Sequence, residues 1–183
     1  MLEIRIHGRG GQGAQVGCQI LAEAFFRAGL WVQAFAAYGG ERRGAPVTAF
    51  LRIDDRPIRI RCDIEQPHHA LVLDRTLLAE PALTGPLRPG GVLVVNSPEG
   101  PLPGPPRAGR VVRVDATAIA QAHGLGAIVA TAVLGAFAGA TGLVALEDLR
   151  AAVEQGSPAR RRENVEACAE GYLAAAGLAR VGA

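Results

Sequence analysis

Lysine is absent from this chain. All 19 basic side chains among its 183 residues are arginines. This absence excludes a phosphate-binding loop that ends in lysine, a Schiff-base lysine and a lysine general base. The 17 acidic residues nearly balance the arginines and leave a net charge of +2. This near equality of positive and negative charges gives no indication of nucleic acid or of an anionic membrane surface as a partner.

Cysteine is scarce. The three cysteines are Cys18, Cys62 and Cys168, and they form no C-x-x-C pair. An iron–sulfur cluster usually takes four thiolates, and a structural zinc ion takes closely spaced pairs. We therefore expect no metal site on this chain and free thiols in a reducing cytoplasm. Residues 1–13 also lack the apolar run that marks a signal peptide.

Large side chains are few in the one long uncharged run, residues 127–146 (AIVATAVLGAFAGATGLVAL). Its length would suit a membrane span, but alanine, glycine and threonine dominate it, and Thr141-Gly142 is typical of a helix end. We therefore predict a helix of about 14 residues that is buried between protein layers. The spacing Gly135-x-x-x-Gly139 would allow a neighbouring helix to approach closely.

The composition fits a single folded domain over residues 1–183, because 49% of the residues are apolar and 20% are charged. Hydrophobic spacing predicts an α/β fold whose sheet is mostly parallel, with one antiparallel hairpin and helices on both faces. The hairpin is expected to join residues 47–53 to 57–61 through an acidic turn at 54–56. The other predicted strands are 3–7, 31–36, 69–73, 92–95 and 110–114. The predicted helical segments are 14–28, 77–83, 116–122, 127–140, 146–154 and 159–176.

A glycine-rich turn lies between the first strand and the first helix. Its residues Gly8, Arg9, Gly10, Gly11, Gln12 and Gly13 fit the pattern G-x-G-x-x-G. Such a turn lets a ligand approach the backbone and presents free amides at the helix start to a phosphate or carboxylate. Dinucleotide binding also needs an acidic residue at the end of the second strand, and none occurs there. Two interpretations remain: anion or cofactor contact, and tight packing of the strand against the helix.

A second glycine-rich loop follows the second strand, with the sequence YGGERRGAP at residues 38–46. In a mostly parallel sheet this loop would lie at the same edge as the first turn. Arg42 and Arg43 offer planar donors for carboxylate or phosphate. We therefore add Tyr38, Glu41, Arg42 and Arg43 to the candidate cofactor-binding residues. The alternative is a solvated turn in which Glu41 pairs with an arginine.

No catalytic set emerges from the remaining residues. The sequence has no G-x-S-x-G motif and no evident Ser-His-Asp set. His7 is expected to be a hydrogen-bonded residue at a strand end, and His68-His69 are not expected to bind metal. We therefore predict no catalytic and no metal-binding residue on this chain.

Two motifs occur together in this sequence, GRGGQGA at residues 8–14 and YGGERRGAPV at residues 38–47. The stretches VLGAFAGATGLVALEDL (133–149) and NVEACAEGY (164–172) follow in order. In this combination the chain resembles the gamma subunits of the 2-oxoacid:ferredoxin oxidoreductases, in the pyruvate/2-ketoisovalerate branch. The ERRGAP form resembles pyruvate-type chains, whereas indolepyruvate and 2-oxoglutarate relatives tend to have RGG there.

The resemblance implies a Rossmann-like domain that packs against catalytic subunits. It implies a complex that decarboxylates a 2-oxoacid on thiamine diphosphate, passes electrons through [4Fe–4S] clusters to ferredoxin and transfers the acyl group to coenzyme A. The alpha and beta chains would hold most of the thiamine site and a delta chain the clusters. Two other interpretations stay open: a free-standing nucleotide-binding oxidoreductase and a purely structural interaction module.

Overall fold

A computed structural model describes residues 1–38, 44–80, 85–103 and 109–179 of the chain. Six strands form one sheet in the order β2-β3-β1-β4-β5-β6. They are β1 (Leu2–Arg9), β2 (Trp31–Tyr38), β3 (Pro46–Asp54), β4 (His69–Val72), β5 (Val92–Asn96) and β6 (Arg110–Val114). The strands β1, β4, β5 and β6 pair in parallel, while β3 runs antiparallel to both of its neighbours. The predicted α/β class with a mostly parallel sheet is confirmed.

The sheet contains an antiparallel hairpin, as predicted, but the prediction that it joins residues 47–53 to 57–61 is wrong. β3 pairs with β2 on one side and with β1 on the other, so neither edge of β3 is open to a further strand. Residues 57–61 form no strand, although their alternating pattern predicted one, and Ile60 is exposed. The hairpin therefore joins 31–38 to 46–54, across the glycine-rich loop.

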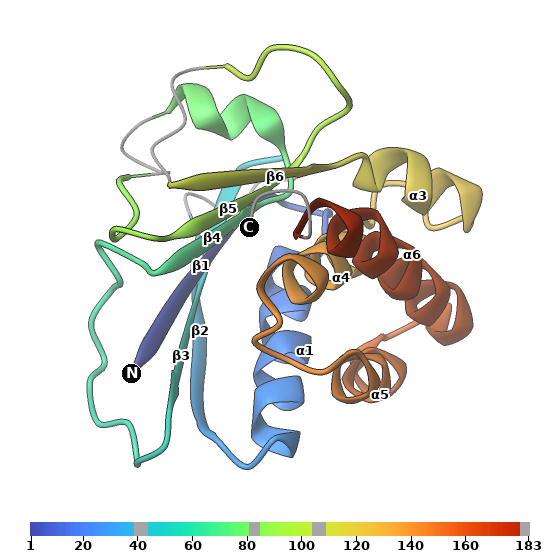
Figure 1. Cartoon of the computed structure of the whole chain (residues 1–183). Coiled ribbons are helices and arrows are strands. Elements are labelled where there is room, and N and C mark those ends of the chain that lie inside the picture. Colours follow the sequence, from blue (N-terminus) through green and yellow to red (C-terminus); the bar gives the residue numbers. More distant parts are fainter. Residues whose placement is uncertain (39–43, 81–84, 104–108, 180–183) are drawn as a thin grey trace.

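The α-helices of the described residues gather on one face of the sheet (Figure 1). They are α1 (Ala14–Arg27), α3 (Ala116–Ala122), α4 (Ala130–Thr141), α5 (Leu146–Gly156) and α6 (Arg161–Ala179). On the opposite face, the short 3-10 helix η1 (Arg75–Ala79) packs its Leu77 against apolar side chains of β4 and β5. Helices thus lie on both faces, as predicted, but within the described residues one face has all the α-helices and the other has only the short helix η1. The predicted helical segment 77–83 extends into residues 81–84, which lie outside the described part of the chain.

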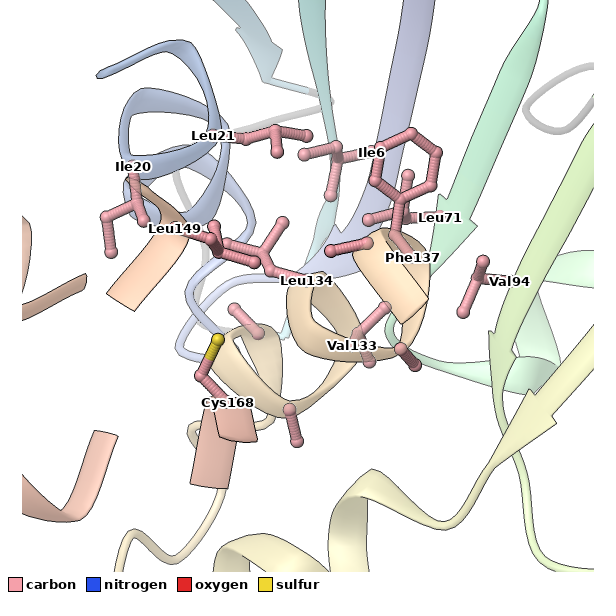
Figure 2. Close-up of a cluster of buried hydrophobic side chains, with 14 of the residues drawn as sticks. Ile6, Ile20, Leu21, Leu71, Val94, Val133, Leu134, Phe137, Leu149 and Cys168 are labelled. Atoms are coloured by element: carbon pink, nitrogen blue, oxygen red, sulfur yellow. The ribbon is translucent and has the colours of Figure 1, made fainter. Parts of the chain in front are cut away.

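The main core lies between the sheet and α4. Figure 2 shows Ile6, Leu71 and Val94 of three neighbouring strands facing Val133, Leu134 and Phe137 of α4. The helix α4 is buried on nearly all sides, as predicted for the uncharged run, and Gly142 ends it with a φ of 65°. Within the described residues, no helix has the length and apolar character needed to cross a membrane.

Helices α6 and α4 pack so closely that their backbones are in contact. A methyl group on Gly135 would lie 1.9 Å from the Cys168 carbonyl oxygen, and one on Gly139 would lie 2.4 Å from that of Tyr172. From the α6 side, a methyl group on Gly171 would lie 2.1 Å from the Ala132 carbonyl oxygen. The spacing Gly135-x-x-x-Gly139 therefore serves close helix packing inside the protein, as predicted.

Candidate functional site

The glycine turn between β1 and α1 has a backbone shape that its glycines permit. Gly11 and Gly13 have φ angles of 99° and 88°, a region that side chains with a Cβ disfavour. The Gln12 amide donates to the Arg9 carbonyl at 3.0 Å, and the Gln12 side-chain oxygen accepts from the Arg9 amide at 2.8 Å. Gly13 is the N-cap of α1 and supplies no side-chain cap. The N-terminus of α1 therefore has no N-cap side chain, and the positive end of a helix favours an anion.

Arg9 anchors this turn to the segment after β4. Its Nε donates to Asp74 Oδ2 at 2.9 Å, and a terminal nitrogen donates to Thr76 Oγ1 at 2.9 Å. Burial would raise the pKa of Asp74, but hydrogen bonds from Thr76 and the charge of Arg9 outweigh burial and hold that pKa below its ordinary value. The structure thus gives both Arg9 and Gln12 partners within the protein, and both stabilise the shape of the turn.

The two glycine-rich segments meet at one end of the sheet. Gly8 of β1 and Tyr38 of β2 pair with the same residue, Val47 of β3. The Gly10 amide donates to the Ala45 carbonyl at 3.0 Å, so the turn also contacts the end of the second loop. The backbone of Tyr38 closes β2 here. Glu41, Arg42 and Arg43 lie outside the described residues.

A cavity of about 550 Å³ opens beside the glycine turn on the helical side of the sheet. Three segments far apart in the sequence line it: the turn with the first half of α1, residues 124–131, and the connection from α5 to α6. Most of the lining is glycine, alanine and aliphatic side chains. Of the described residues that line it, Arg9 and Arg160 are charged and none is acidic.

Sequence reasoning missed the polar residues of the cavity wall. Asn164 donates to the carbonyl oxygens of Ala159 at 3.1 Å and Arg160 at 2.9 Å, and accepts from the Thr131 hydroxyl at 3.0 Å. Arg160 has a φ of 49°, and its guanidinium donates to the Gly124 carbonyl. Ser157 is buried, and its hydroxyl has no hydrogen-bond partner among the residues that the structure describes. These residues lie more than a hundred positions after the glycine turn, and no motif connects them to it.

The ring nitrogens of His7, His68 and His69 lie within hydrogen-bonding distance of groups of neighbouring strands, as expected of histidines with a structural role. Burial, reinforced by the charge of Arg5, lowers the pKa of His7 to about 3, and Thr48 Oγ1 lies 3.3 Å from its Nδ1. His68 Nδ1 accepts from the Glu3 amide at 3.0 Å, and His69 Nδ1 accepts from the Val92 amide at 3.1 Å. In the part of the chain that the structure covers, no three metal-ligating side chains come together.

The described lining contains no candidate base for nucleophilic catalysis, because histidine, aspartate and glutamate are absent from it. All three cysteines are free thiols, as predicted. Burial raises the pKa of the Cys18 and Cys168 thiols to about 12, which keeps them protonated. The cavity offers a binding surface with the N-terminus of α1 on one side and mostly apolar walls.

The family model described as pyruvate ferredoxin/flavodoxin oxidoreductase matches residues 3–174. A relative from Thermococcus kodakarensis, the pyruvate/ketoisovalerate oxidoreductases common subunit gamma, is 48% identical over 178 residues, which cover 94% of this chain and 96% of that protein. Pyruvate synthase subunit PorC of Methanocaldococcus jannaschii is 47% identical over 154 residues, covering 84% of each chain.

Among solved structures, pyruvate oxidoreductase subunit PORC from Thermotoga maritima superposes with a TM-score of 0.78 at 37% identity, covering 94% of this chain and 95% of that one. The same fold occurs in a 2-oxoglutarate:ferredoxin oxidoreductase from Magnetococcus marinus, at a TM-score of 0.78 and 20% identity, where the match covers 31% of the longer chain. The resemblance carried by the two glycine-rich motifs is thereby confirmed, and the chain belongs to the pyruvate ferredoxin/flavodoxin oxidoreductase family, among its gamma-type subunits.

Proposed function

We propose that this chain is the gamma subunit of a multi-subunit, thiamine-diphosphate-dependent 2-oxoacid:ferredoxin oxidoreductase, with pyruvate as the favoured 2-oxoacid. The observation that carries the proposal is the 48% identity to a gamma subunit over 94% of the chain. In the proposed reaction the 2-oxoacid loses carbon dioxide, its acyl group forms a thioester with coenzyme A, and two electrons pass through [4Fe–4S] clusters to ferredoxin.

The division of labour is the one that the family resemblance implies. We propose that a delta-type chain carries the clusters and that alpha- and beta-type chains hold most of the thiamine site, and the three scattered cysteines of this chain agree with it. Residues 1–183 would form one gamma-type unit of this cytoplasmic complex. The unit contributes binding surface and no catalytic residue.

We further propose that the two glycine-rich segments contact the shared active-site region or the path of coenzyme A. The position of Gly8 and Tyr38 at one end of the sheet supports this, as does the N-terminus of α1, which begins at a glycine N-cap. The proposed ligand-contacting residues are Gly8, Arg9, Gly10, Gly11, Gln12, Gly13, Tyr38, Glu41, Arg42 and Arg43.

The direct test is purification of the tagged chain from its native organism and identification of the proteins that accompany it. We expect alpha-, beta- and delta-type subunits in fixed proportion. We also expect reduction of ferredoxin that requires pyruvate and coenzyme A. A chain that purifies alone, together with a complex that keeps full activity without it, would contradict the proposal.

The arginine pair provides a sharper test of the site. The double variant Arg42→Gln/Arg43→Gln should lower the activity or the assembly of the reconstituted complex, while the isolated subunit keeps its unfolding midpoint. Arg59 and Arg61 offer a matched control, because both are exposed and follow the opposite end of β3. Equal effects of the two double variants would argue against a specific role of Arg42 and Arg43.

A further inference from the structure

We propose that β2 is an interface between two copies of this chain, which pair antiparallel along their β2 strands and continue one sheet across a twofold axis at Ala34. Such pairing uses an edge of the sheet to which the proposed function gives no role, and it does not depend on that function. Three observations support it: the open strand has no charge, the adjoining side of α1 has none either, and the strand sequence is complementary to itself.

β2 is an unprotected edge strand. In the described part of the chain it is the last strand of the sheet, with β3 on one side only. Its eight residues, WVQAFAAY, include no charge, no proline and no glycine. Edge strands usually carry charges or proline, or are very short, because an open row of amides and carbonyls otherwise pairs with another chain. A strand of this length, about 26 Å at ~3.3 Å per residue, is therefore expected to pair with a further strand.

The strand at the other edge of the sheet has the opposite character. β6 has five residues, and its Arg110 and Arg113 are both exposed. Short length and exposed charges are two of the ways in which proteins prevent pairing between sheet edges. Of the two edge strands, β2 is thus the one that lacks these safeguards.

The side of α1 next to this edge is uncharged as well. α1 lies between β2 and α5 (Figure 1). Ile20 of α1 faces α5, because it would lie 2.8 Å from a methyl group on Gly156, and Cys18 faces the sheet, because its thiol donates to a carbonyl of β3. The acidic residue of α1, Glu23, is paired with Arg27 at 3.1 Å. The residues of the remaining side, which borders the β2 edge, are all uncharged: Gln15, Gln19, Ala22 and Phe26.

The sequence of β2 fits a second copy of itself in one register. Side chains alternate along the strand, so even-numbered residues face the helices and odd-numbered residues face the opposite side. A twofold axis perpendicular to the sheet must then pass through a residue of β2, because directly opposite side chains of an antiparallel pair point to the same face. With the axis at Ala34, each bulky side chain lies opposite a smaller one: Trp31 opposite Ala37, Phe35 opposite Gln33, and Val32 opposite Ala36. An axis at Phe35 would leave Trp31, which is 53% exposed, beyond the end of the second copy's β2.

The absence of charge favours a second copy over a partner of different sequence. A twofold interface brings each surface patch against itself, so a charge within the patch would lie close to a like charge. The edge of β2 and the adjoining side of α1 avoid this repulsion. Association would also remove Phe26 and Trp31, which are 61% and 53% exposed, from water.

The test is the mass of the full-length subunit in solution, measured by light scattering and sedimentation over a range of concentrations. We expect the wild type to be a dimer at about 100 µM. Ala34 is exposed, and Ala34→Lys places two ammonium groups opposite each other at the axis, so it should weaken dimerisation about tenfold or more. Ala174→Lys is the matched control, because Ala174 is an exposed alanine of α6, and it should leave the dimer unchanged. Far-ultraviolet circular dichroism verifies that the variants fold.

A mixture of two variants tests whether the partner is a second copy. Ala34→Glu alone should be monomeric for the same reason as Ala34→Lys. When the two proteins are mixed, opposite charges face each other across the axis, and dimers that contain one chain of each should form. No other occupant of the edge would give this result.

A wild type that is monomeric at about 100 µM, a dimer that survives Ala34→Lys, or a mixture that stays monomeric would overturn the inference. So would the loss of a different subunit from the purified complex on Ala34→Lys, since another chain would then occupy the edge. Co-purification of the wild-type chain with the other subunits tests the proposed function separately.

Discussion

Arg52 of β3 and Glu3 of β1 form an ion pair inside the protein, with Arg52 Nε donating to Glu3 Oε1 at 3.0 Å and only 1% of the arginine side chain exposed. The arginine also donates to the Gln33 side-chain oxygen of β2 at 3.2 Å. It thereby links three neighbouring strands, β2, β3 and β1, on the face of the sheet opposite the α-helices. A single arginine in the strand sequence PVTAFLRID gives no sign of this role.

Removal of this arginine should destabilise the fold strongly. Arg52→Met leaves the Glu3 carboxylate buried with one of its two arginine partners missing, and loss of a partner from a buried pair costs about 3–5 kcal/mol. Urea unfolding measures the change. The control is Arg56→Met, which breaks an exposed pair with Asp55 and should cost less than ~1 kcal/mol. Similar losses of unfolding free energy in the two variants would show that the buried pair stabilises the fold no more than the exposed pair does.

His7 should make the protein sensitive to acid. Its pKa is about 3 in the folded chain because of burial and the charge of Arg5, whereas an unfolded histidine titrates near 6.5. Between these values the unfolded chain binds the additional proton, so stability falls as the pH is lowered from 6.5 towards 3. His7→Asn should reduce the difference in unfolding free energy between pH 7 and pH 4.5. A His7 ring that titrates near pH 6.5 in NMR spectra would contradict this assignment.

The Arg9–Asp74 pair should control the order of the glycine turn. Asp74→Asn keeps the size of the side chain but removes the charge that Arg9 Nε contacts at 2.9 Å. We expect faster amide exchange of residues 8–13 in the variant. Because the pKa of Asp74 is held below its ordinary value of 3.8, its charge stabilises the fold above that pH and loses this effect as the pH falls. The unfolding free energies of the wild type and the variant should therefore converge in acid, and a constant difference would refute the argument.

Backbone contact between α4 and α6 should make Gly135 intolerant of any side chain. In Gly135→Ala the new methyl group would lie 1.9 Å from a carbonyl oxygen, so the helices must separate, and we expect a loss of about 3 kcal/mol or more. Gly17→Ala is the control, because its methyl group would meet flexible or small side chains and no carbonyl oxygen, with Ala130 Cβ at 3.2 Å and Leu134 Cδ1 at 3.8 Å. Thermal unfolding distinguishes the two. A Gly135→Ala protein as stable as the control would exclude this packing.

Most elements could be predicted because their patterns are local. The strand at 110–114 and the helix at 116–122 have the predicted bounds, and the glycine turn lies where β1 meets α1. The partners of β3 could not be predicted, because a run such as PVTAFLRID does not say which strands lie beside it. Residues 57–61 alternate equally well, yet both edges of β3, the strand they were expected to join, are already paired with β1 and β2.

The glycine turn of the candidate site could be predicted from the sequence, whereas the cavity residues from α4, α6 and the connection before α6 could not. The motif G-x-G-x-x-G predicts a turn from six neighbouring residues, because the shape of that turn depends on their own backbone angles. Ser157, Asn164 and Thr131 acquire their roles only when α4, α5 and α6 pack beside α1. A serine before a proline and an asparagine within a helix are ordinary surface residues in a sequence, so the fold alone reveals that they are buried.

The insertion of β3 between β1 and β2 sets a minimum length for any molecule that touches both Gly8 and Tyr38. Gly8 and Tyr38 flank Val47 from opposite sides, and two strand spacings separate them by about 10 Å. A compact ion such as inorganic phosphate reaches only one of these two residues. An elongated molecule with polar groups at both positions can bridge them, so this end of the sheet selects candidate ligands by their span as well as by their charge.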